Sequence, residues 1–311
     1  MRIVVTGGAG FIGGNLCRAL TGGQAAHEVV AFDDLSTGLR ANLDGTPTQL
    51  VEGTLLDAAL VDRTVAGADA VVHLAARPSV PRSLEDPMAS YAVNCTGTMH
   101  VLEAARRAGA QVIAASSSSV YGANPTMPKT ESLATLPISP YGASKLAAEA
   151  LALSYQSSFG LGVLCFRFFN VYGPLQQAGH AYAAVIPTFI EATLRGRPVT
   201  VHGDGRQTRD FTYVGTVVSV LRDAVERRVT APGPVNLALG TRTSLLDLIV
   251  ALGEAGCPPA AIEHVEARAG DVRDSQADDT RLRELFPDVS PVPLAEGLAE
   301  TVAWLRHSTA S

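Results

Sequence analysis

The sequence predicts an α/β fold in which a doubly wound parallel sheet carries a smaller C-terminal α/β lobe. Short apolar runs alternate with helical stretches through the first half of the 311 residues, as consecutive β-α-β units require. Gly7, Gly10 and Gly13 follow the first apolar run and open the first helical stretch. After Asn170 the alternation ends, and prolines separate shorter elements, which indicates a second lobe.

The strands are predicted from apolar runs, because a strand covered on both faces is apolar without alternation. They are expected at Ile3–Val5, Glu28–Phe32, Ala70–Leu74, Gln111–Ala115 and Gly162–Phe166. Helices are expected between and after them, at Phe11–Leu20, Leu56–Val65, Met88–Ala108 and Tyr141–Phe159. Val235–Leu239 again resembles a buried strand, so the chain is expected to return to the first sheet before a helix at Leu245–Gly253. We therefore predict a dinucleotide-binding domain over 1–170, rejoined by about 210–240, and a substrate lobe over 171–311.

Composition excludes several classes of function. With 47% hydrophobic residues the chain can build a large core, and a net charge of −6 without a basic run argues against nucleic acid or a membrane surface as partner. The four cysteines, Cys17, Cys95, Cys165 and Cys257, have neither C-x-x-C nor zinc spacing, so we expect buried, reduced thiols and no metal site. No signal-peptide core or transmembrane-length segment is present, and we expect a cytoplasmic protein.

The glycine loop predicts a dinucleotide site of the Rossmann type. Glycines at this spacing allow a tight turn, close approach to a diphosphate and close packing of helix on sheet, with the helix N-terminus facing the anion. Asp33, after the second strand, can bind the adenosine ribose, and Asp34 disfavours the 2′-phosphate of NADP, so NAD is the expected cofactor. Ser36, Thr37 and Gly38 either donate further hydrogen bonds near the adenosine or form a plain turn.

Three side chains predict redox chemistry beside that cofactor. Tyr141 and Lys145 are four residues apart, so on a helix the ammonium lies one turn from the phenol and favours its ionised form. Ser117 ends the Gln111–Ala115 strand, at the edge where open parallel sheets bind ligands. Read alone, the serines at 116–119 would be a polar strand end, but the downstream tyrosine and lysine favour a catalytic Ser117.

The whole chain resembles the extended short-chain dehydrogenase/reductase family, and within it the NAD-dependent UDP-sugar 4-epimerases. The resemblance rests on ordered stretches at Thr6–Gly13, His73–Ala76, Asn94, Ser116–Gly122, Tyr141–Lys145, Arg167–Pro174, Gly203–Val214 and Arg268–Asp278. It implies that Tyr141 is the general base, that Lys145 binds the nicotinamide ribose and lowers the pKa of Tyr141, and that Ser117 binds the reacting hydroxyl. The cofactor pocket would include Phe11, Ile12, Leu74, Ala75, Ala76, Asn94 and Phe169.

The same resemblance implies the substrate contacts. Asn170, Arg209 and Arg268 would bind the diphosphate, with Asp271 close to Arg268; read alone, the two arginines could equally be surface charges. Val185, Phe189 and Val201 would contact uridine, although as isolated apolar residues they would be assigned to a core. The family commonly has Asp where Thr54 stands, so adenine recognition is expected to rest on Asp57 or on backbone groups.

Two short stretches bear on the reaction and the sugar. The family's 4,6-dehydratases and decarboxylases carry carboxylates just after the catalytic hydroxyl residue, where this chain has Ser118 and Ser119, so epimerisation at C4 is favoured over a dehydratase or another oxidoreductase of the family. A module that binds the dinucleotide only to sense redox state would be expected to lack one of Ser117, Tyr141 and Lys145. All three are present, which argues against this alternative. The stretch at 79–83 resembles epimerases of UDP-N-acetylhexosamines, and Ser275 leaves room for a bulky substituent.

The identity of the sugar stays open at this stage. Arg82, Ser118 and Ser119 could receive a C6 carboxylate, although Arg82 could instead pair with Glu85 or Asp86. Because of the 79–83 stretch and Ser275, the UDP-GlcNAc/GalNAc and UDP-Glc/Gal pairs together rank slightly ahead of UDP-GlcA/GalA. The long helices at Met88–Ala108 and Tyr141–Phe159 would form a four-helix dimer interface by the same resemblance, so a homodimer is expected, while packing on the sheet is the alternative.

Overall fold

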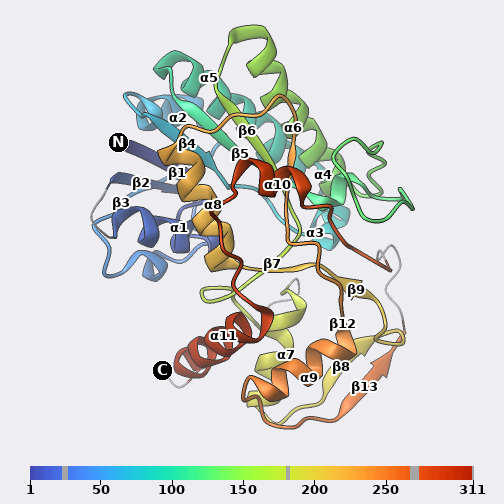
Figure 1. The fold of residues 1–311 in the computed structure, drawn as a ribbon. Coiled ribbons are helices and arrows are strands. Elements are labelled where there is room, and N and C mark those ends of the chain that lie inside the picture. The colour runs from blue at the N-terminus through green and yellow to red at the C-terminus, as the bar shows by residue number, and fades with distance from the viewer. Residues whose placement is uncertain (23–26, 180–182, 267–272, 310–311) are drawn as a thin grey trace.

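A seven-stranded parallel sheet forms the centre of the molecule in the computed structural model, which describes residues 1–22, 27–179, 183–266 and 273–309 (Figure 1). From one edge to the other it contains β11 (Val235–Leu237), β6 (Val163–Phe168), β5 (Gln111–Ser117), β4 (Ala70–His73), β1 (Arg2–Thr6), β2 (Glu28–Asp33) and β3 (Gln49–Glu52). Every neighbouring pair is parallel. The predicted doubly wound sheet is confirmed, including the return of the chain at Val235.

Helices cover both faces of this sheet (Figure 1). On one face, Val4, Val71 and Val112 pack with side chains of three helices, α2 (Ala58–Val65), α5 (Thr98–Ala108) and α6 (Pro140–Phe159). The alternate residues, such as Ile3 and Val5, pack on the other face against α1 (Phe11–Thr21) and α8 (Val214–Glu226). Successive side chains of a strand point to opposite faces, so these runs had to be apolar throughout.

The predicted helix Met88–Ala108 is not one regular helix. It comprises α4 (Pro87–Tyr91), a π-helical turn at Ala92–Gly97 and α5, and is preceded by the short α3 (Val80–Glu85). Within the π-helical turn, Asn94 is buried and its carbonyl oxygen accepts the hydroxyl of Thr98 at 2.6 Å. Insertions of one residue into a helix of this kind are rare and have no signature in residue propensities. The apolar pattern therefore predicted the helical character but not the break.

Within the described residues, the C-terminal lobe is built from three two-stranded sheets and three helices. The strands pair as β7 (Asn170–Tyr172) with β10 (Phe211–Tyr213), β8 (Val199–His202) with β13 (Ile262–Val265), and β9 (Thr208–Arg209) with β12 (Thr243–Ser244). The helices are α7 (Val185–Leu194), α9 (Leu245–Glu254) and α11 (Leu294–Thr309), whereas α10 (Thr280–Leu285) packs against β11 at the edge of the main sheet. The division into residues 1–170 and 171–311 stays a proposal, because α8, β11 and α10 lie with the first part and the other elements after residue 170 lie with the second.

One hydrophobic core runs through both parts. Leu16 of α1 and Val217 of α8 belong to the same buried cluster as Ile190, Leu248 and Leu298 of the C-terminal helices. The four cysteines are buried and free, as predicted. None of the helices in the described part of the chain combines the length and apolar character needed to cross a bilayer.

Candidate active site

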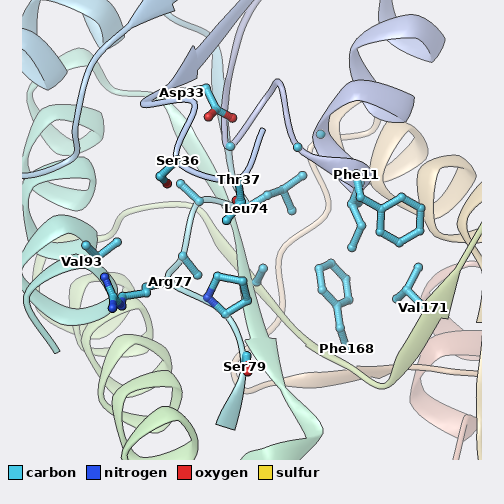
Figure 2. Close-up of a pocket in the computed structure, with 18 of the residues that line it drawn as sticks. Phe11, Asp33, Ser36, Thr37, Leu74, Arg77, Ser79, Val93, Phe168 and Val171 are labelled. Atoms are coloured by element: carbon cyan, nitrogen blue, oxygen red, sulfur yellow. The ribbon is translucent and has the colours of Figure 1, made fainter. Parts of the chain in front are cut away.

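The carboxyl ends of the parallel strands open onto a cavity of about 720 Å³ (Figure 2). Ligands bind at this edge of open α/β sheets. The predicted site residues that line the cavity are Gly7, Gly10, Phe11, Ile12, Gly13, Asp33, Asp34, Ser36, Thr37, Leu74, Ala75, Ala76, Arg82, Ser117, Tyr141, Lys145 and Phe169. The glycine loop and the predicted catalytic residues, more than 100 positions apart in the sequence, therefore share one cavity.

The glycine loop has a backbone that larger residues would not permit. Gly7 has a φ of +70°, and a Cβ there would lie 2.8 Å from the backbone nitrogen of Ala75. A Cβ at Gly13 would lie 2.0 Å from the carbonyl oxygen of Gly7, so loop and helix α1 touch. No side chain among the described residues caps α1 at Gly10, which leaves the first backbone N–H groups of the helix free for an anion.

Asp33 is buried at the end of β2 and stabilises this loop directly. Its carboxylate accepts hydrogen bonds from the backbone nitrogens of Ala9 (3.0 Å) and Leu35 (2.9 Å). Burial raises the pKa of Asp33, while these hydrogen bonds act against that rise. Asp34 accepts from the nitrogen and the hydroxyl of Ser36, at 2.9 and 2.5 Å, so its negative charge remains beside the cavity. Figure 2 shows Asp33, Ser36 and Thr37 together at this end.

Ser117 and Tyr141 meet at the end of β5. Ser117 Oγ donates to Ser119 Oγ (3.0 Å) and accepts from the nitrogen of Ser119 (3.1 Å), and both Ser117 and Tyr141 line the cavity. Burial raises the pKa of Tyr141, and the nearby Ser117 hydroxyl acts in the opposite direction. Desolvation of the phenol is thus the larger effect on the pKa of Tyr141 in the protein without ligand, and the pKa-lowering role of Lys145 stays a proposal.

Lys145 lies buried one helical turn after Tyr141. Burial lowers its pKa to about 8, and the nearby Cys165, Cys95 and Glu149 act against that shift. Glu149, one further turn along α6, is fully engaged by other groups: Arg167 donates to both of its oxygens, at 2.6 and 2.9 Å, and Ser116 donates at 2.6 Å. A bidentate pair of this kind fixes the positions of the helix and both strand ends beneath the site.

His73 performs a similar positioning role on the other side. Its ring nitrogens lie 2.7 Å from Thr6 Oγ1 and 2.9 Å from Thr98 Oγ1, so it joins the ends of β1 and β4 to helix α5. Burial, and secondly the charge of Lys145, lowers the pKa of His73 to about 3. His73 therefore stays neutral throughout the physiological range.

Residues 3–238 match the NAD dependent epimerase/dehydratase family, which is three quarters of the chain. The chain belongs to this family. It is thus an enzyme of an NAD-dependent family whose members modify nucleotide sugars, which confirms the predicted cofactor and the resemblance to extended short-chain dehydrogenases/reductases. Within the described ranges, no group of three or more His, Cys, Asp or Glu side chains could hold a metal ion.

Relatives within the family carry different reactions. UDP-glucose 4-epimerase of Mycolicibacterium smegmatis is 38% identical, covering 99% of this chain and 100% of the relative. A dTDP-glucose 4,6-dehydratase of Streptomyces griseus is also 38% identical, covering 97% and 93%. Among solved structures, UDP-N-acetylglucosamine 4-epimerase from Methanobrevibacter ruminantium M1, in complex with UDP-N-acetylmuramic acid, aligns with a TM-score of 0.93 and 34% identity over 99% of this chain and 98% of that one. Identity alone therefore does not separate epimerases from dehydratases.

Three of the expected cofactor residues do not line the cavity. Asn94 is saturated within the protein: Oδ1 accepts from the nitrogen of Arg77 (2.7 Å), and Nδ2 donates to Ser144 Oγ (2.9 Å). Asp57 caps helix α2, accepting from the nitrogen of Leu60 at 3.0 Å. Gly38 packs behind Asp33, where a Cβ would lie 2.8 Å from Oδ1. Roles for these three residues toward NAD remain proposals.

The expected uridine contacts are corrected in part. Phe189 and Val201 are buried members of the main core and are not among the described residues that line the cavity. Val185 is partly buried and packs on the same core. The reading of these residues as core, which their apolar character alone suggested, is the one that the structure supports.

The expected polar substrate contacts are dispersed. Arg209 donates to the carbonyl oxygens of Thr208 (2.9 Å) and Arg273 (3.2 Å). Ser118, Ser119, Asn170 and Ser275 are partly buried but do not line the cavity. Arg268 and Asp271 lie outside the described residues. Roles for these seven remain proposals.

Several cavity residues escaped the sequence analysis. They include Arg77, Ser79, Leu175 and Gln176, which lie in loops after strands, together with Val93 of the π-helical turn and Val171 of β7. Arg77 is the most informative. Its Nε is buried and has no hydrogen-bond partner in the described part of the chain, while its Nη2 lies 3.5 Å from Asp86. A cation with an unused donor in this cavity fits an anionic ligand.

The cavity thus fits NAD on features of the protein itself. The glycine cradle and the free N-terminus of α1 suit a diphosphate, Asp33 suits a ribose, and the unused Arg77 donor supplies positive charge. Of these, only Arg77 carried no signal in the sequence, since its position depends on Asn94, 17 residues away, which binds both its backbone nitrogen and its carbonyl oxygen.

Proposed function

We propose that the protein is an NAD-dependent UDP-sugar 4-epimerase, which inverts C4 of a UDP-hexose through a transient 4-keto sugar. The observation that carries the proposal is the distribution of carboxylates in the cavity. Among the described residues that line it, Asp33 and Asp34 are the only acidic ones, and both lie beside Ser36 at the end proposed for adenosine. Elimination of water, the dehydratase reaction, needs an additional acid and base beside the sugar, and Ser118 and Ser119 supply none.

The chain's own residues fit the proton transfers of this reaction. Tyr141 would take the proton of the sugar 4-hydroxyl, while Ser117, which lines the same cavity, would hold that hydroxyl in place. Lys145, charged below a pKa of about 8, would bind the nicotinamide ribose and favour the phenolate. Bound NAD supplies the reversible hydride acceptor at C4. Because inversion involves no net oxidation, the reduced cofactor must stay bound until the ketone has presented its other face.

For the sugar, the proposal ranks three UDP-hexose pairs. UDP-GlcNAc/GalNAc and UDP-Glc/Gal are the first candidates, since the stretch at 79–83 resembles N-acetylhexosamine epimerases and Ser275 is small. One observation favours UDP-GlcA/GalA as the second candidate: Arg82 lines the cavity and could pair with a C6 carboxylate. Arg209, Asn170 and Arg268 are proposed to bind the UDP diphosphate.

Incubation without added cofactor tests the proposal. The purified protein would be mixed separately with UDP-glucose, UDP-N-acetylglucosamine and UDP-glucuronate, and the configuration at C4 followed by proton NMR. We expect inversion of at least one of them. No inversion of any sugar, even after addition of NAD⁺, would rule out the UDP-sugar epimerase and shift the assignment to another reaction of the family.

We also propose a homodimer. Leu84, Met88, Tyr91 and Met99 are exposed on α3, α4 and α5, with Met88 75% exposed, so these helices present apolar side chains to solvent. Packing of this face and of α6 against a second copy would bury them. Sedimentation of wild-type protein and of Met88→Glu tests it: the variant should become monomeric, and equal sedimentation of the two would contradict this interface. The cytoplasmic location stays a prediction from the sequence.

A further inference from the structure

Gln176 belongs to a loop that packs against the glycine helix at one wall of the cavity. The loop follows β7, and the side chain of Asn15 in α1 holds it by donating to the carbonyl oxygen of Pro174 at 2.9 Å. Leu175 packs toward Gly14, where a Cβ would lie 3.1 Å from its Cδ1. Leu175 itself has a φ of +69°, an uncommon conformation for a side-chain-bearing residue. The surrounding contacts therefore fix the conformation of this loop.

The orientation of the Gln176 amide follows from its one side-chain hydrogen bond. Nε2 lies 3.2 Å from the carbonyl oxygen of Val171, which can only accept, so the NH₂ group must face Val171. Oε1 then points the opposite way. This oxygen is buried and has no hydrogen-bond partner among the described residues, although Gln176 lines the cavity.

A buried acceptor without a donor costs folding free energy, and such atoms are rare in native proteins. The described part of the chain holds five buried side-chain polar atoms in this state, and two of them belong to cavity residues, Arg77 and Gln176. Arg77 offers a donor and suits the anionic diphosphate. Gln176 offers an acceptor, so it requires a ligand group of the opposite kind.

We propose that Gln176 Oε1 is a ligand-binding atom, which accepts a hydrogen bond from an N–H or O–H group of the bound ligand. Two sources in the proposed function carry such a donor: the carboxamide of the NAD nicotinamide and a hydroxyl of the sugar. Val171, which orients Gln176, lies on the same side of the cavity as Phe168 and Phe11 (Figure 2), and all three pack on the main core. The inference rests on the assignment of this cavity to NAD and a UDP-sugar.

Gln111 provides a matched control. Its Nε2 donates to the carbonyl oxygen of Val229 at 2.7 Å, and its Oε1 is also buried without a partner in the described residues. It begins β5 at the end of the sheet opposite Ser117, and it does not line the cavity. Gln176→Met and Gln111→Met therefore remove the same groups, one donor to a carbonyl oxygen and one unpaired acceptor. Gln176 lies where a ligand would bind, and Gln111 does not.

The experiment compares these two variants with the wild type in three measurements. Without ligand, both variants should melt within a few degrees of the wild type, since each loses one hydrogen bond and one unpaired acceptor. The NAD that remains bound through purification and its dissociation rate are then measured, followed by the KM for the sugar. Gln176→Met should weaken binding of one ligand about 10-fold, the loss expected for one hydrogen bond, and Gln111→Met should change neither.

The pattern of loss identifies the donor. Faster NAD release in Gln176→Met supports the carboxamide, and a raised KM with normal NAD retention supports a sugar hydroxyl. If both ligands bind Gln176→Met as they bind the wild type, or if Gln111→Met loses as much, the proposal is overturned. Should no UDP-sugar be turned over by the wild type, the NAD measurements and the thermal shifts induced by UDP-sugars still test Gln176 separately from the epimerase assignment.

Discussion

Lys145 and Lys129 are the two lysines of the chain, and both are buried. Burial lowers the pKa of Lys145 to about 8 from an ordinary value of 10.5. Between these two values the unfolded chain holds a proton that the folded protein has released, so folding stability rises with pH over this window. Below pH 8, the buried Lys145 ammonium makes the free energy of unfolding about 3 kcal/mol lower than it is above pH 10.5.

We therefore predict that Lys145 titrates near pH 8 in the cofactor-free protein. Selective labelling of lysine for NMR gives two side-chain signals, which Lys129→Arg assigns. The free energy of unfolding of the wild type should also rise relative to that of Lys145→Met as the pH rises from 8 to 10.5. A Lys145 signal that titrates at 10 or above would show that the site does not desolvate the ammonium.

At this scale, the sequence predicted residues that carry their own pattern and missed those placed by tertiary contacts. Ser117, Tyr141 and Lys145 follow from one strand end and one helical turn, and they share the cavity as expected. Arg77 and Gln176 are placed by Asn94 and Val171, through hydrogen bonds that no local pattern encodes. Phe189 and Val201 were expected to contact uridine but lie in the main core, because the sequence does not distinguish an apolar residue at a ligand from one in a core.

At the scale of elements, helix α3 holds the start of the catalytic helix. The backbone N–H of Tyr141, in the first turn of α6, has no partner within the helix. It donates instead to Ser83 Oγ at 3.0 Å, while that hydroxyl donates to the carbonyl oxygen of Val80 at 2.7 Å. Ser83 is completely buried, and its helix also carries the cavity residue Arg82. Ser83 is thus a positioning residue for Tyr141.

Ser83→Ala should lower kcat about 10-fold and leave the KM for the sugar nearly unchanged, because the reacting phenol loses its fixed position while the binding contacts remain. Stability should fall by about 1 kcal/mol from the lost hydrogen bond. Ser90→Ala is the control, since Ser90 is equally buried but its hydroxyl donates, among the described residues, to the carbonyl oxygen of Asp86 at the start of its own helix, at 3.1 Å. Equal loss of kcat in the two variants would contradict the positioning role.

Element prediction succeeded where burial was complete. The strands β1, β2, β4, β5 and β6 were all expected, because each is buried on both faces. Strand β3 (Gln49–Glu52) was missed, since it is a half-exposed edge strand whose residues form no apolar run. The π-helical turn was missed because such turns have no signature in residue propensities, and the hydrogen bonds of Asn94 to Arg77 and Ser144 within it are not visible in the sequence.

At the scale of the whole molecule, the shared core joins the cofactor part to the C-terminal lobe. Trp304, the single tryptophan, lies in α11 and packs on the same cluster as α1 and β1. We predict one cooperative unfolding transition, in which Trp304 fluorescence and far-UV circular dichroism change together. NAD, which binds the folded protein, should shift both signals by the same amount. If NAD shifts the circular dichroism transition but not the Trp304 fluorescence transition, the C-terminal lobe unfolds separately.

The most direct test of the central claim uses UDP-sugar labelled with deuterium at C4. The account predicts that the product carries the label at C4 with inverted configuration, because the hydride returns to the carbon that it left and never exchanges with solvent. Mass and proton NMR spectra of the product measure this in one experiment. A product that has lost water, or a label that appears at another carbon or in free NADH, would contradict the epimerase and identify one of the family's other reactions.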